Sequence, residues 1–321
     1  MRVLPYDELS PPMHRDRALL HLSAFGGVFL SREIALMRRK LPTFSDYVGL
    51  FAVEGARVLG QLYVLRLPYE FSDGPGTISG IAGVATRPDV GRTGIARRLL
   101  TEAHRRERRA GQRYCSLWTN RSWGAHALYE SLGYRDVYAP PWAVHLPGET
   151  RPAGREPKGV RPGRVTDLQG IERLHDRAAE GRWGFRRRPP GSLLVDHRRK
   201  YLDPKENLLV VSERGTLTGY AHLNRSPQRL LCGELVAASP TVRRALVDEV
   251  IRRAGRLPAA FQHTFVSDAP ELFPEPPYVS VPGGWYVFMA CELGRSWRAS
   301  EARARFGTED PRFLCLAGDR F

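Results

Sequence analysis

The sequence predicts an α/β fold in which one structural unit occurs twice along the chain. β-rich runs alternate with segments of helical period, and a length of 321 residues suits two domains of about 100–200 residues each. Two β-rich runs around a glycine-containing turn at residues 49–64 have a counterpart of the same kind at residues 208–223. A long-period repeat of this kind indicates a duplicated domain.

The first copy alternates between β-rich runs and stretches whose apolar residues recur at helical spacing. These patterns predict strands and amphipathic helices, respectively. A loop rich in Pro, Gly and Asp at 68–76 separates two of the strands, and Gly133 ends the last helix. The expected elements are a mostly helical stretch at 17–39, strands at 49–53, 58–64 and 78–85, a helix that follows Pro88, a strand at 115–118, a helix at 123–132 and a strand at 137–146.

The second copy follows a linker. Residues 147–163 hold four prolines and four glycines and carry no apolar stripe. Beyond them we expect a helix at 167–179, strands at 208–211, 218–223 and 230–237, and a helix at 242–254. The predicted organisation is a first domain at 1–147, a linker at 148–163, a second domain at 164–294, and a C-terminal helix and tail at 295–321.

The basic excess of the chain does not by itself indicate a nucleic-acid-binding protein. The sequence holds 49 Lys and Arg against 34 Asp and Glu, for a net charge of +15, but only four of the basic residues are Lys. A GC-rich coding sequence gives such a skew toward Arg without selection for binding. We interpret the clusters at 105–109, 186–188 and 198–200 as solvated surface, so nucleic acid is not an expected partner. A basic surface still favours anionic ligands such as phosphates.

The four cysteines lie far apart and form no CxxC pair, which excludes a conventional zinc knuckle and a disulfide framework. Cys115 lies in an apolar run and is expected to be a buried thiol. The nine histidines show no HExxH or HxH spacing, so no metal site is expected. No run approaches about 18 apolar residues, and the N-terminus lacks the apolar region of a secretory signal. These features predict a cytoplasmic protein without a membrane partner.

Residues 81–100 form the stretch that points to chemistry. A β-rich run leads through a short loop into an amphipathic helix. Gly94 and Ala96 let a ligand approach the helix N-terminus closely, where free N–H groups and the helix dipole favour an anion. Arg92 and Arg97 add positive charge for the same anion. A pyrophosphate suits this arrangement, although the bare glycine pattern also occurs where glycine serves packing alone.

This stretch resembles the acetyl-CoA motif of the GCN5-related N-acetyltransferase (GNAT) superfamily, in which Arg/Gln-x-x-Gly-x-Gly/Ala opens a helix. The preceding hairpin, the strand at 115–118 and the segment Ala-His-Ala-Leu-Tyr-Glu-Ser-Leu-Gly-Tyr at 125–134 resemble that superfamily in the same order. The resemblance covers about residues 1–146. Together with the internal repeat, this resemblance implies two tandem GNAT-like domains. Each would be a mixed, mostly antiparallel sheet flanked by helices. Gly91 departs from the motif, so one phosphate contact is missing or comes from Arg92.

The resemblance implies roles for individual residues of the first copy. Val84 and Thr86 would lend backbone groups to the pantetheine arm of acetyl-CoA. Tyr129 would be the catalytic general acid that protonates the leaving thiolate. The alternative is that Tyr129 serves only as an aromatic packing residue of the core. Asn120 lies two residues before the usual Asn position of the superfamily, where Ser122 stands. The residues that this resemblance assigns to acetyl-CoA are Val84, Ala85, Thr86, Arg92, Thr93, Gly94, Ile95, Ala96, Arg97 and Asn120.

The general base stays open at this point. An ammonium substrate must lose a proton before it attacks, and the third strand offers no acidic side chain for this step. Glu70, Asp73 and a water chain are candidates. The tail at 310–321 resembles that of the enhanced-intracellular-survival aminoglycoside acetyltransferases, tandem enzymes whose C-terminal Phe carboxylate reaches the active site. That resemblance adds the carboxylate of Phe321 as a candidate for the general base. The alternative is that the tail is frayed and plays no part in catalysis. Only 28 residues follow Leu293, so we expect no counterpart of the third domain of that group in this sequence.

We expect the second copy to bind no acetyl-CoA, because its loop at 234–246 lacks the glycine of the motif and the β-branched Val242 would crowd a pyrophosphate. The predicted function is that of an acetyl-CoA-dependent N-acetyltransferase that acts on a primary amine of a small molecule or peptide. The alternative is a non-catalytic protein that senses acyl-CoA or presents a basic surface. The sequence leaves open the acceptor amine and the oligomeric state, a homo-oligomer included.

Overall fold

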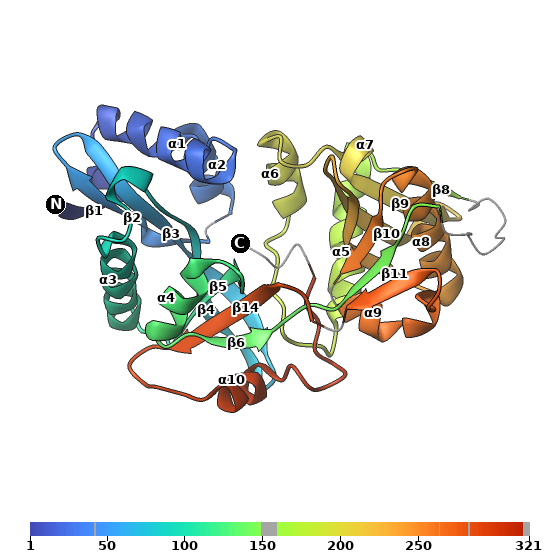
Figure 1. Cartoon of the computed structure of the whole chain (residues 1–321). Coiled ribbons are helices and arrows are strands. Elements are labelled where there is room, and N and C mark those ends of the chain that lie inside the picture. Colours follow the sequence, from blue (N-terminus) through green and yellow to red (C-terminus); the bar gives the residue numbers. More distant parts are fainter. Residues whose placement is uncertain (42, 149–158, 263, 282, 317–321) are drawn as a thin grey trace. The chain divides into compact units, whose positions relative to one another are not determined.

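The computed structural model describes residues 1–41, 43–148, 159–262, 264–281 and 283–316. The chain divides into two compact units, each with its own sheet (Figure 1). Met1–Tyr138 and Tyr286–Glu309 make up the first unit. Ala139–Trp285 and the described residues from Asp310 onward make up the second. The chain therefore leaves the first unit after Tyr138 and returns to it at Tyr286.

In the described part of the chain, the first unit holds a seven-stranded sheet with the order β1-β2-β3-β4-β5-β14-β6. Only β4 and β5 run parallel to each other, and the other neighbours are antiparallel. The predicted mixed, mostly antiparallel sheet is confirmed. The strands are β1 (Arg2–Pro5), β2 (Phe44–Glu54), β3 (Arg57–Phe71), β4 (Gly74–Thr86), β5 (Tyr114–Asn120), β6 (Arg135–Tyr138) and β14 (Tyr286–Glu292).

The helices of the first unit pack on this sheet through the apolar positions that the sequence pattern marks. In α3, Ile95, Leu99 and Leu100 are buried, and Gly60 on β3 lies beneath Ile95 and Leu99. A Cβ at Gly60 would lie 2.7 Å from Ile95 Cγ2, so glycine is needed for this close approach. The helices are α1 (Pro11–Phe25), α2 (Ser31–Lys40), α3 (Ile95–Arg109), α4 (Gly124–Ser131) and α10 (Ala299–Phe306), with 3₁₀ turns at Tyr6–Glu8 and Pro88–Val90.

The second unit repeats this plan. Its described residues form a seven-stranded sheet with the order β13-β7-β12-β11-β10-β9-β8, in which only β11 and β12 are parallel. The strands are β7 (Trp142–His145), β8 (Val160–Pro162), β9 (Leu208–Glu213), β10 (Thr216–Arg225), β11 (Leu230–Ala237), β12 (Ala259–Gln262) and β13 (Tyr278–Val281). The helices are α5 (Leu168–Ala179), α6 (Ser192–Arg198), α7 (Pro204–Asn207), α8 (Pro240–Ala254) and α9 (Thr264–Asp268), with 3₁₀ turns at Val165–Asp167 and Pro270–Leu272.

The structure corrects the predicted strand at 137–146. β6 ends at Tyr138 in the first sheet, and β7 begins at Trp142 in the second. Pro140 and Pro141 lie between them and lack the N–H groups that a continuous strand would need. The predicted first domain at 1–147 therefore includes a strand, β7, that pairs only within the second unit among the described residues.

Two further segments differ from the sequence-based organisation. Val160–Pro162 lies in the predicted linker but forms β8, which pairs with β9. Tyr286–Glu292 lies in the predicted second domain but forms β14, which pairs with β5 and β6 of the first sheet. Each sheet thus receives one strand from the other half of the sequence. No helix in the described part of the chain is long and apolar enough to span a membrane.

A buried ion pair stabilises the interior of the second unit. Arg188 donates two hydrogen bonds, of 2.8 and 2.7 Å, to the carboxylate of Glu234, and both side chains are almost fully buried. Tyr220 donates to the same carboxylate. Burial opposes ionisation of Glu234, but the Arg188 guanidinium holds the pKa of this carboxyl below its usual range. The interpretation of residues 186–188 as solvated surface is therefore wrong for Arg188.

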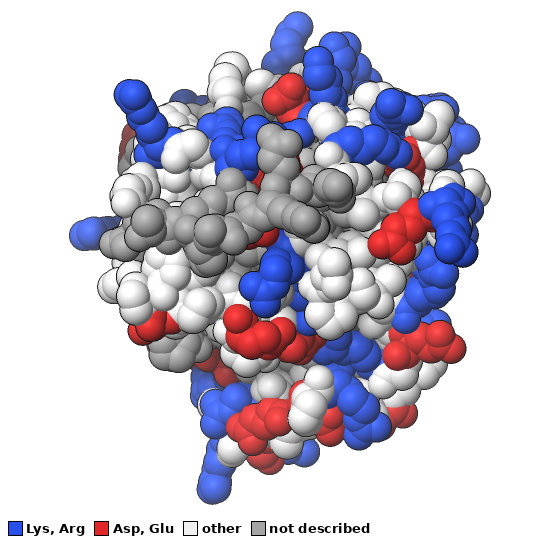
Figure 2. All heavy atoms as spheres, turned by 90° about the vertical axis from the view of Figure 1, so that its right-hand side faces the viewer, with Lys and Arg blue, Asp and Glu red and all other residues white. Residues whose placement is uncertain are grey.

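Elsewhere, basic side chains mix with acidic ones. Figure 2 shows one face of the molecule on which Lys and Arg side chains are interspersed with Asp and Glu. In the cluster at 105–109, Arg105 and Arg106 form ion pairs with Glu102 on the surface of α3. Many basic side chains are therefore paired locally with acidic ones, and the net charge of +15 is the excess of basic over acidic residues in the sequence.

We predict that Arg188→Leu lowers the free energy of unfolding by about 3–5 kcal/mol, because it leaves the Glu234 carboxylate buried without its cation. The double variant Arg188→Leu/Glu234→Gln should regain much of this loss, since the uncompensated charge is then absent. Urea unfolding monitored by circular dichroism measures both effects. Arg198→Leu, at an exposed position of α6, is the control and should change stability by no more than about 0.5 kcal/mol. A similar small effect of Arg188→Leu would contradict the prediction.

Candidate active site

The first sheet opens between β4 and β5. These parallel strands pair only at Ser79 with Cys115 and at Gly80 with Ser116. β4 then continues to Thr86 and β5 to Asn120 without pairing to each other. Peptide groups on the facing edges of this opening are therefore available to a ligand. The predicted cofactor residues Val84, Ala85 and Thr86 lie on this part of β4.

A bulge bends β4 within the opening. Gly83 adopts φ +58°, and the pairing register between β3 and β4 shifts between Gln61 and Tyr63. A Cβ at Gly83 would lie 2.9 Å from the Tyr63 ring, so both the positive φ and the tight packing require glycine. The bulge is the point at which β4 departs from regular strand geometry.

The N-terminus of α3 follows β4 after a short loop and is not capped by any side chain. Its first intrahelical hydrogen bond runs from the Arg98 N–H to the Gly94 carbonyl at 3.0 Å. The N–H groups of Ile95, Ala96 and Arg97 are thus left without intrahelical acceptors. Gly94 has φ +83°, and the space beside its Cα is open. This terminus suits an anion that approaches the backbone directly.

The predicted cofactor residues around this terminus differ in whether their side chains are free for a ligand or already engaged within the protein. Arg92 is exposed and has φ +62°, so its backbone is in the left-handed region, as at Gly94. Thr93 Oγ1 donates to the Val90 carbonyl at 2.7 Å, which fixes the loop. Arg97 Nη2 donates to Ser131 Oγ at 2.8 Å, so it ties α3 to α4. The side chain of Ile95 is buried, so only its backbone is available to a ligand.

Tyr129 lies on α4 and is buried among aromatic side chains. Its ring packs edge-on against Tyr134 with centroids 5.8 Å apart. Burial and the nearby Tyr286 raise the pKa of Tyr129 to about 12, so the phenol keeps its proton at neutral pH. The Tyr129 hydroxyl forms no hydrogen bond within the described residues, which leaves it available to a ligand.

The predicted cofactor residue Asn120 lies at the end of β5. Its side-chain oxygen accepts hydrogen bonds from the N–H and Oγ of Ser122, at 2.9 and 2.8 Å.

Comparison with known proteins agrees with this geometry. Residues 46–136 match the model of the acetyltransferase (GNAT) domain. The chain carries a GNAT domain. The same residues include β3, β4, α3, β5 and α4, which supply every feature of the opening described above. No curated protein matches the chain.

Solved structures of N-acetyltransferases share the fold of this chain. A GCN5-related N-acetyltransferase from Kribbella flavida has a TM-score of 0.65 at 19% identity and covers 94% of this chain and 72% of its own. A probable N-acyltransferase from Enterococcus faecalis V583 has a TM-score of 0.67 at 15% identity, with coverages of 91% and 72%. Eis1 from Mycobacterium abscessus has a TM-score of 0.58 at 15% identity, with coverages of 92% and 74%. The predicted resemblance to the tandem GNAT type is confirmed at the level of the fold.

Two of the sequence-based candidates for the general base, Glu70 and Asp73, lie away from the opening of the GNAT sheet. Glu70 lies near the end of β3, where it pairs with Pro75, and Asp73 lies in the turn of the β3–β4 hairpin. Val84 follows Pro75 by nine positions along β4, a span of about 30 Å. Asp73 is in addition ion-paired with Arg305. Phe321 lies outside the described residues.

His21 is a residue that sequence reasoning missed. It lies on α1, half-buried, and its Cε1 is 3.6 Å from the position of a Cβ at Gly83. His21 Nδ1 lies 3.0 Å from Gln61 Nε2, which holds the ring beside the bulge. Burial and the neighbouring Arg17 guanidinium lower the pKa of His21, so the imidazole is neutral at pH 7. A lone histidine on a helix gives no spacing signal, and only the fold brings it to β4.

The second GNAT-like unit differs from the first at the corresponding helix. Gly219 on β10 lies beneath Val242 of α8 as Gly60 lies beneath Ile95 of α3. Val242 is therefore a buried packing residue, and the expectation that it would crowd a ligand is wrong. The N-terminus of α8 is instead closed by its own N-cap, because Ser239 Oγ accepts a hydrogen bond from the Val242 N–H at 3.3 Å.

The opening of the second sheet also contains a side chain that the first lacks. Gly60 pairs with Thr86, and Gly219 pairs with Ala237. Three residues before these partners stand Gly83 in β4 and Glu234 in β11. The buried Glu234 and its ion pair with Arg188 thus occupy the region that corresponds to the glycine bulge of the first unit.

Proposed function

We propose that the protein is an acetyl-CoA-dependent N-acetyltransferase with a single working site in the first unit. The observation that carries this proposal is the uncapped N-terminus of α3 beside the opening between β4 and β5. The free N–H groups at Ile95–Arg97 suit a pyrophosphate, and the unpaired edge of β4 at Val84–Thr86 suits the amide-bearing pantetheine arm. Arg92 supplies charge at the same loop.

The proposed reaction is direct attack of an amine on the thioester carbonyl. The carbon–sulfur bond breaks as the carbon–nitrogen bond forms, and the CoA thiolate leaves. Tyr129 supplies the proton for this thiolate, since its phenol is protonated at neutral pH and forms no hydrogen bond within the described residues. The proton is thus delivered where negative charge develops.

His21 is the group that we propose takes the proton from the attacking ammonium, directly or through a water molecule. It lies beside the bulge at Gly83, and its lowered pKa keeps it in the neutral form that accepts a proton. The aromatic rings of Phe25 and Phe29 flank it, with centroids 4.8 and 5.6 Å from the imidazole. This apolar neighbourhood favours an acceptor whose amine is attached to an apolar part, in a small molecule or a peptide.

The second unit is proposed to bind no CoA, because its α8 N-terminus is capped and its opening contains Glu234. The alternative function is that of a protein that senses acyl-CoA without catalysis. Turnover of acetyl-CoA with a panel of amines distinguishes the two functions. Tight CoA binding without turnover of any amine would favour the sensor.

Gly94→Ala is predicted to raise the Kd for CoA by about tenfold or more, because the methyl group strains a positive φ and stands where the backbone must meet the pyrophosphate. Isothermal titration calorimetry measures this change. Gly111→Ala is a matched control, since Gly111 has φ +79° and open space at the other end of α3. Equal losses of CoA affinity in the two variants would refute the assignment of the pyrophosphate site.

Tyr129→Phe should lower kcat by about 10²-fold while CoA still binds, because only the proton donor is lost. CoA release is followed by liquid chromatography. Tyr134→Phe removes the neighbouring hydroxyl, which lies 2.9 Å from His104 Nε2, and should leave kcat near that of the wild type. An unchanged kcat in Tyr129→Phe would exclude the general-acid role.

His21→Gln is expected to remove the acid limb of the pH profile of kcat/KM. In the wild type this limb lies below about pH 6.5, because the lowered pKa means that His21 protonates only at more acidic pH. His14→Gln is the control, since His14 lies on the same helix and its pKa is also lowered by burial. Persistence of the acid limb in His21→Gln would rule out this base.

A further inference from the structure

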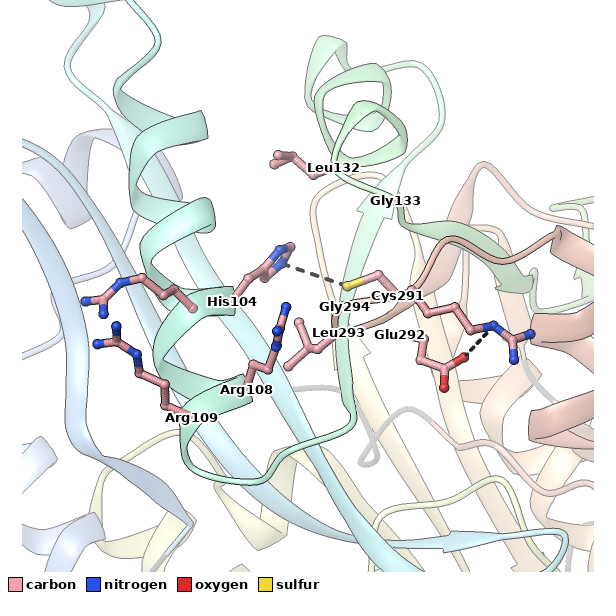
Figure 3. A pocket seen from close by; sticks show the side chains of 11 residues that line it. His104, Arg108, Arg109, Leu132, Gly133, Cys291, Glu292, Leu293 and Gly294 are labelled. Carbon is pink, nitrogen blue, oxygen red and sulfur yellow. Dashed lines mark hydrogen bonds and ion pairs between the residues drawn. The ribbon is translucent and has the colours of Figure 1, made fainter.

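A second pocket lies in the first unit at the C-terminal end of α3 (Figure 3). It has a volume of about 520 Å³ and lies between the last turns of α3, the residues that follow α4, and the end of β14. α3 has 15 residues, so the pocket lies roughly 20 Å along the helix from the proposed pyrophosphate site. The proposed acetyl transfer does not use it.

The lining of this pocket is strongly basic. Arg105, Arg108, Arg109 and Arg295 contribute guanidinium groups, against the single carboxylate of Glu292. Arg105 pairs with Glu102, and Arg295 pairs with Glu292. Arg108 is exposed and forms no ion pair within the described residues. The uncompensated charge favours an anionic ligand.

A thiol and an imidazole meet at the wall of this pocket. Cys291 lines the pocket and is 3% exposed. Figure 3 shows the imidazole of His104 pointing toward Cys291 Sγ, and the two atoms Sγ and Nε2 are 3.9 Å apart. His104 Nε2 also lies 2.9 Å from the Tyr134 hydroxyl, which fixes the ring. A thiol with a neighbouring imidazole in a basic pocket has the surroundings of a reactive cysteine.

A second thiol lies directly behind the first. Cys115 on β5 is the register partner of Cys291 on β14. Burial opposes ionisation of Cys291, but the neighbouring Cys115 thiol and His104 imidazole lower its pKa below the usual thiol range. Burial raises the pKa of Cys115. Cys291, which lines the pocket beside His104, is the nucleophile of the pair, and Cys115, fully buried behind it, is the reserve thiol.

The geometry of the pair also permits a disulfide. Cross-strand partners have Cβ atoms about 4.5–5.5 Å apart, whereas a disulfide needs about 3.5–4.5 Å. An approach of about 1 Å closes this difference. Within the described residues, no group of three His, Cys, Asp or Glu side chains is arranged to hold a metal ion, so metal binding does not explain the cluster.

We propose that Cys291 is a modification site for anionic low-molecular-weight disulfides, and that Cys115 then converts the adduct into a Cys115–Cys291 disulfide. In the first step the Cys291 thiolate attacks one sulfur of the disulfide, whose S–S bond breaks and releases one thiolate. Cys115 then loses its proton to solvent and attacks the Cys291 sulfur, which releases the second thiolate. The protein loses two electrons and two protons, and the small disulfide is reduced to two thiols.

The test treats the full chain with 5,5′-dithiobis(2-nitrobenzoate), a dianionic disulfide. We expect a fast phase that releases two equivalents of the coloured thiolate and leaves a protein two hydrogens lighter, without adduct. Peptide mapping of the wild type should place the new disulfide between Cys115 and Cys291. Cys115→Ala should release one equivalent and retain the adduct on Cys291. Labelling at other cysteines, or no fast phase, would overturn the proposal.

Variants at charged positions test the pocket without disturbing the buried thiols. Arg108→Gln should slow the fast phase about tenfold with the dianionic reagent and leave the rate with neutral 4,4′-dithiodipyridine unchanged. Arg98→Gln, at an exposed position of the same helix, should change neither rate. Cys232→Ala, which removes a buried thiol of the second unit, should retain the fast phase. Equal slowing by Arg98→Gln, or a fast phase that survives Cys291→Ala, would refute the assignment.

Discussion

The parallel contact between β4 and β5 is the constraint on which the candidate site depends. It consists of two residue pairs, after which the strands separate. The separation is fixed from outside, because β3 pairs along β4 and β14 pairs along the whole of β5. The bulge at Gly83 bends β4 within this frame. The opening is therefore a built feature of the sheet, with α4, which carries Tyr129, in contact with β5 and with the start of α3 following β4 after a short loop.

The second unit shows how little is needed to close such an opening. Its sheet has the same order, the same single parallel pair and the same glycine beneath the helix. A serine N-cap on α8 satisfies a free N–H group, and Glu234 brings a buried carboxylate to the position of the bulge. That carboxylate in turn requires Arg188, since a lone buried charge costs several kcal/mol. The second copy has thus exchanged an open anion site for an internal ion pair.

Local pattern was enough to predict the hairpins, α3 with its open N-terminus, and the duplicated α/β fold. It was not enough to assign strands to sheets, because the pairing of β14 with β5 joins residues more than 160 positions apart and leaves no local signal. The burial of Arg188 was missed for a related reason, since a run of three arginines is typical of solvated surface. His21 and Cys291 likewise acquire their neighbours only through the fold.

The helix dipole has opposite effects on an anionic ligand at the two ends of α3, so basic side chains are needed at one end more than at the other. At the N-terminus the helix dipole and the free N–H groups attract an anion, and glycine rather than charge is the critical residue. At the C-terminus the dipole repels an anion, so a basic pocket there needs guanidinium groups to outweigh it. Arg108 and Arg109 in the last turn line the pocket and supply that charge. The reactive position of Cys291 thus depends on side chains, whereas the proposed pyrophosphate site depends on the backbone.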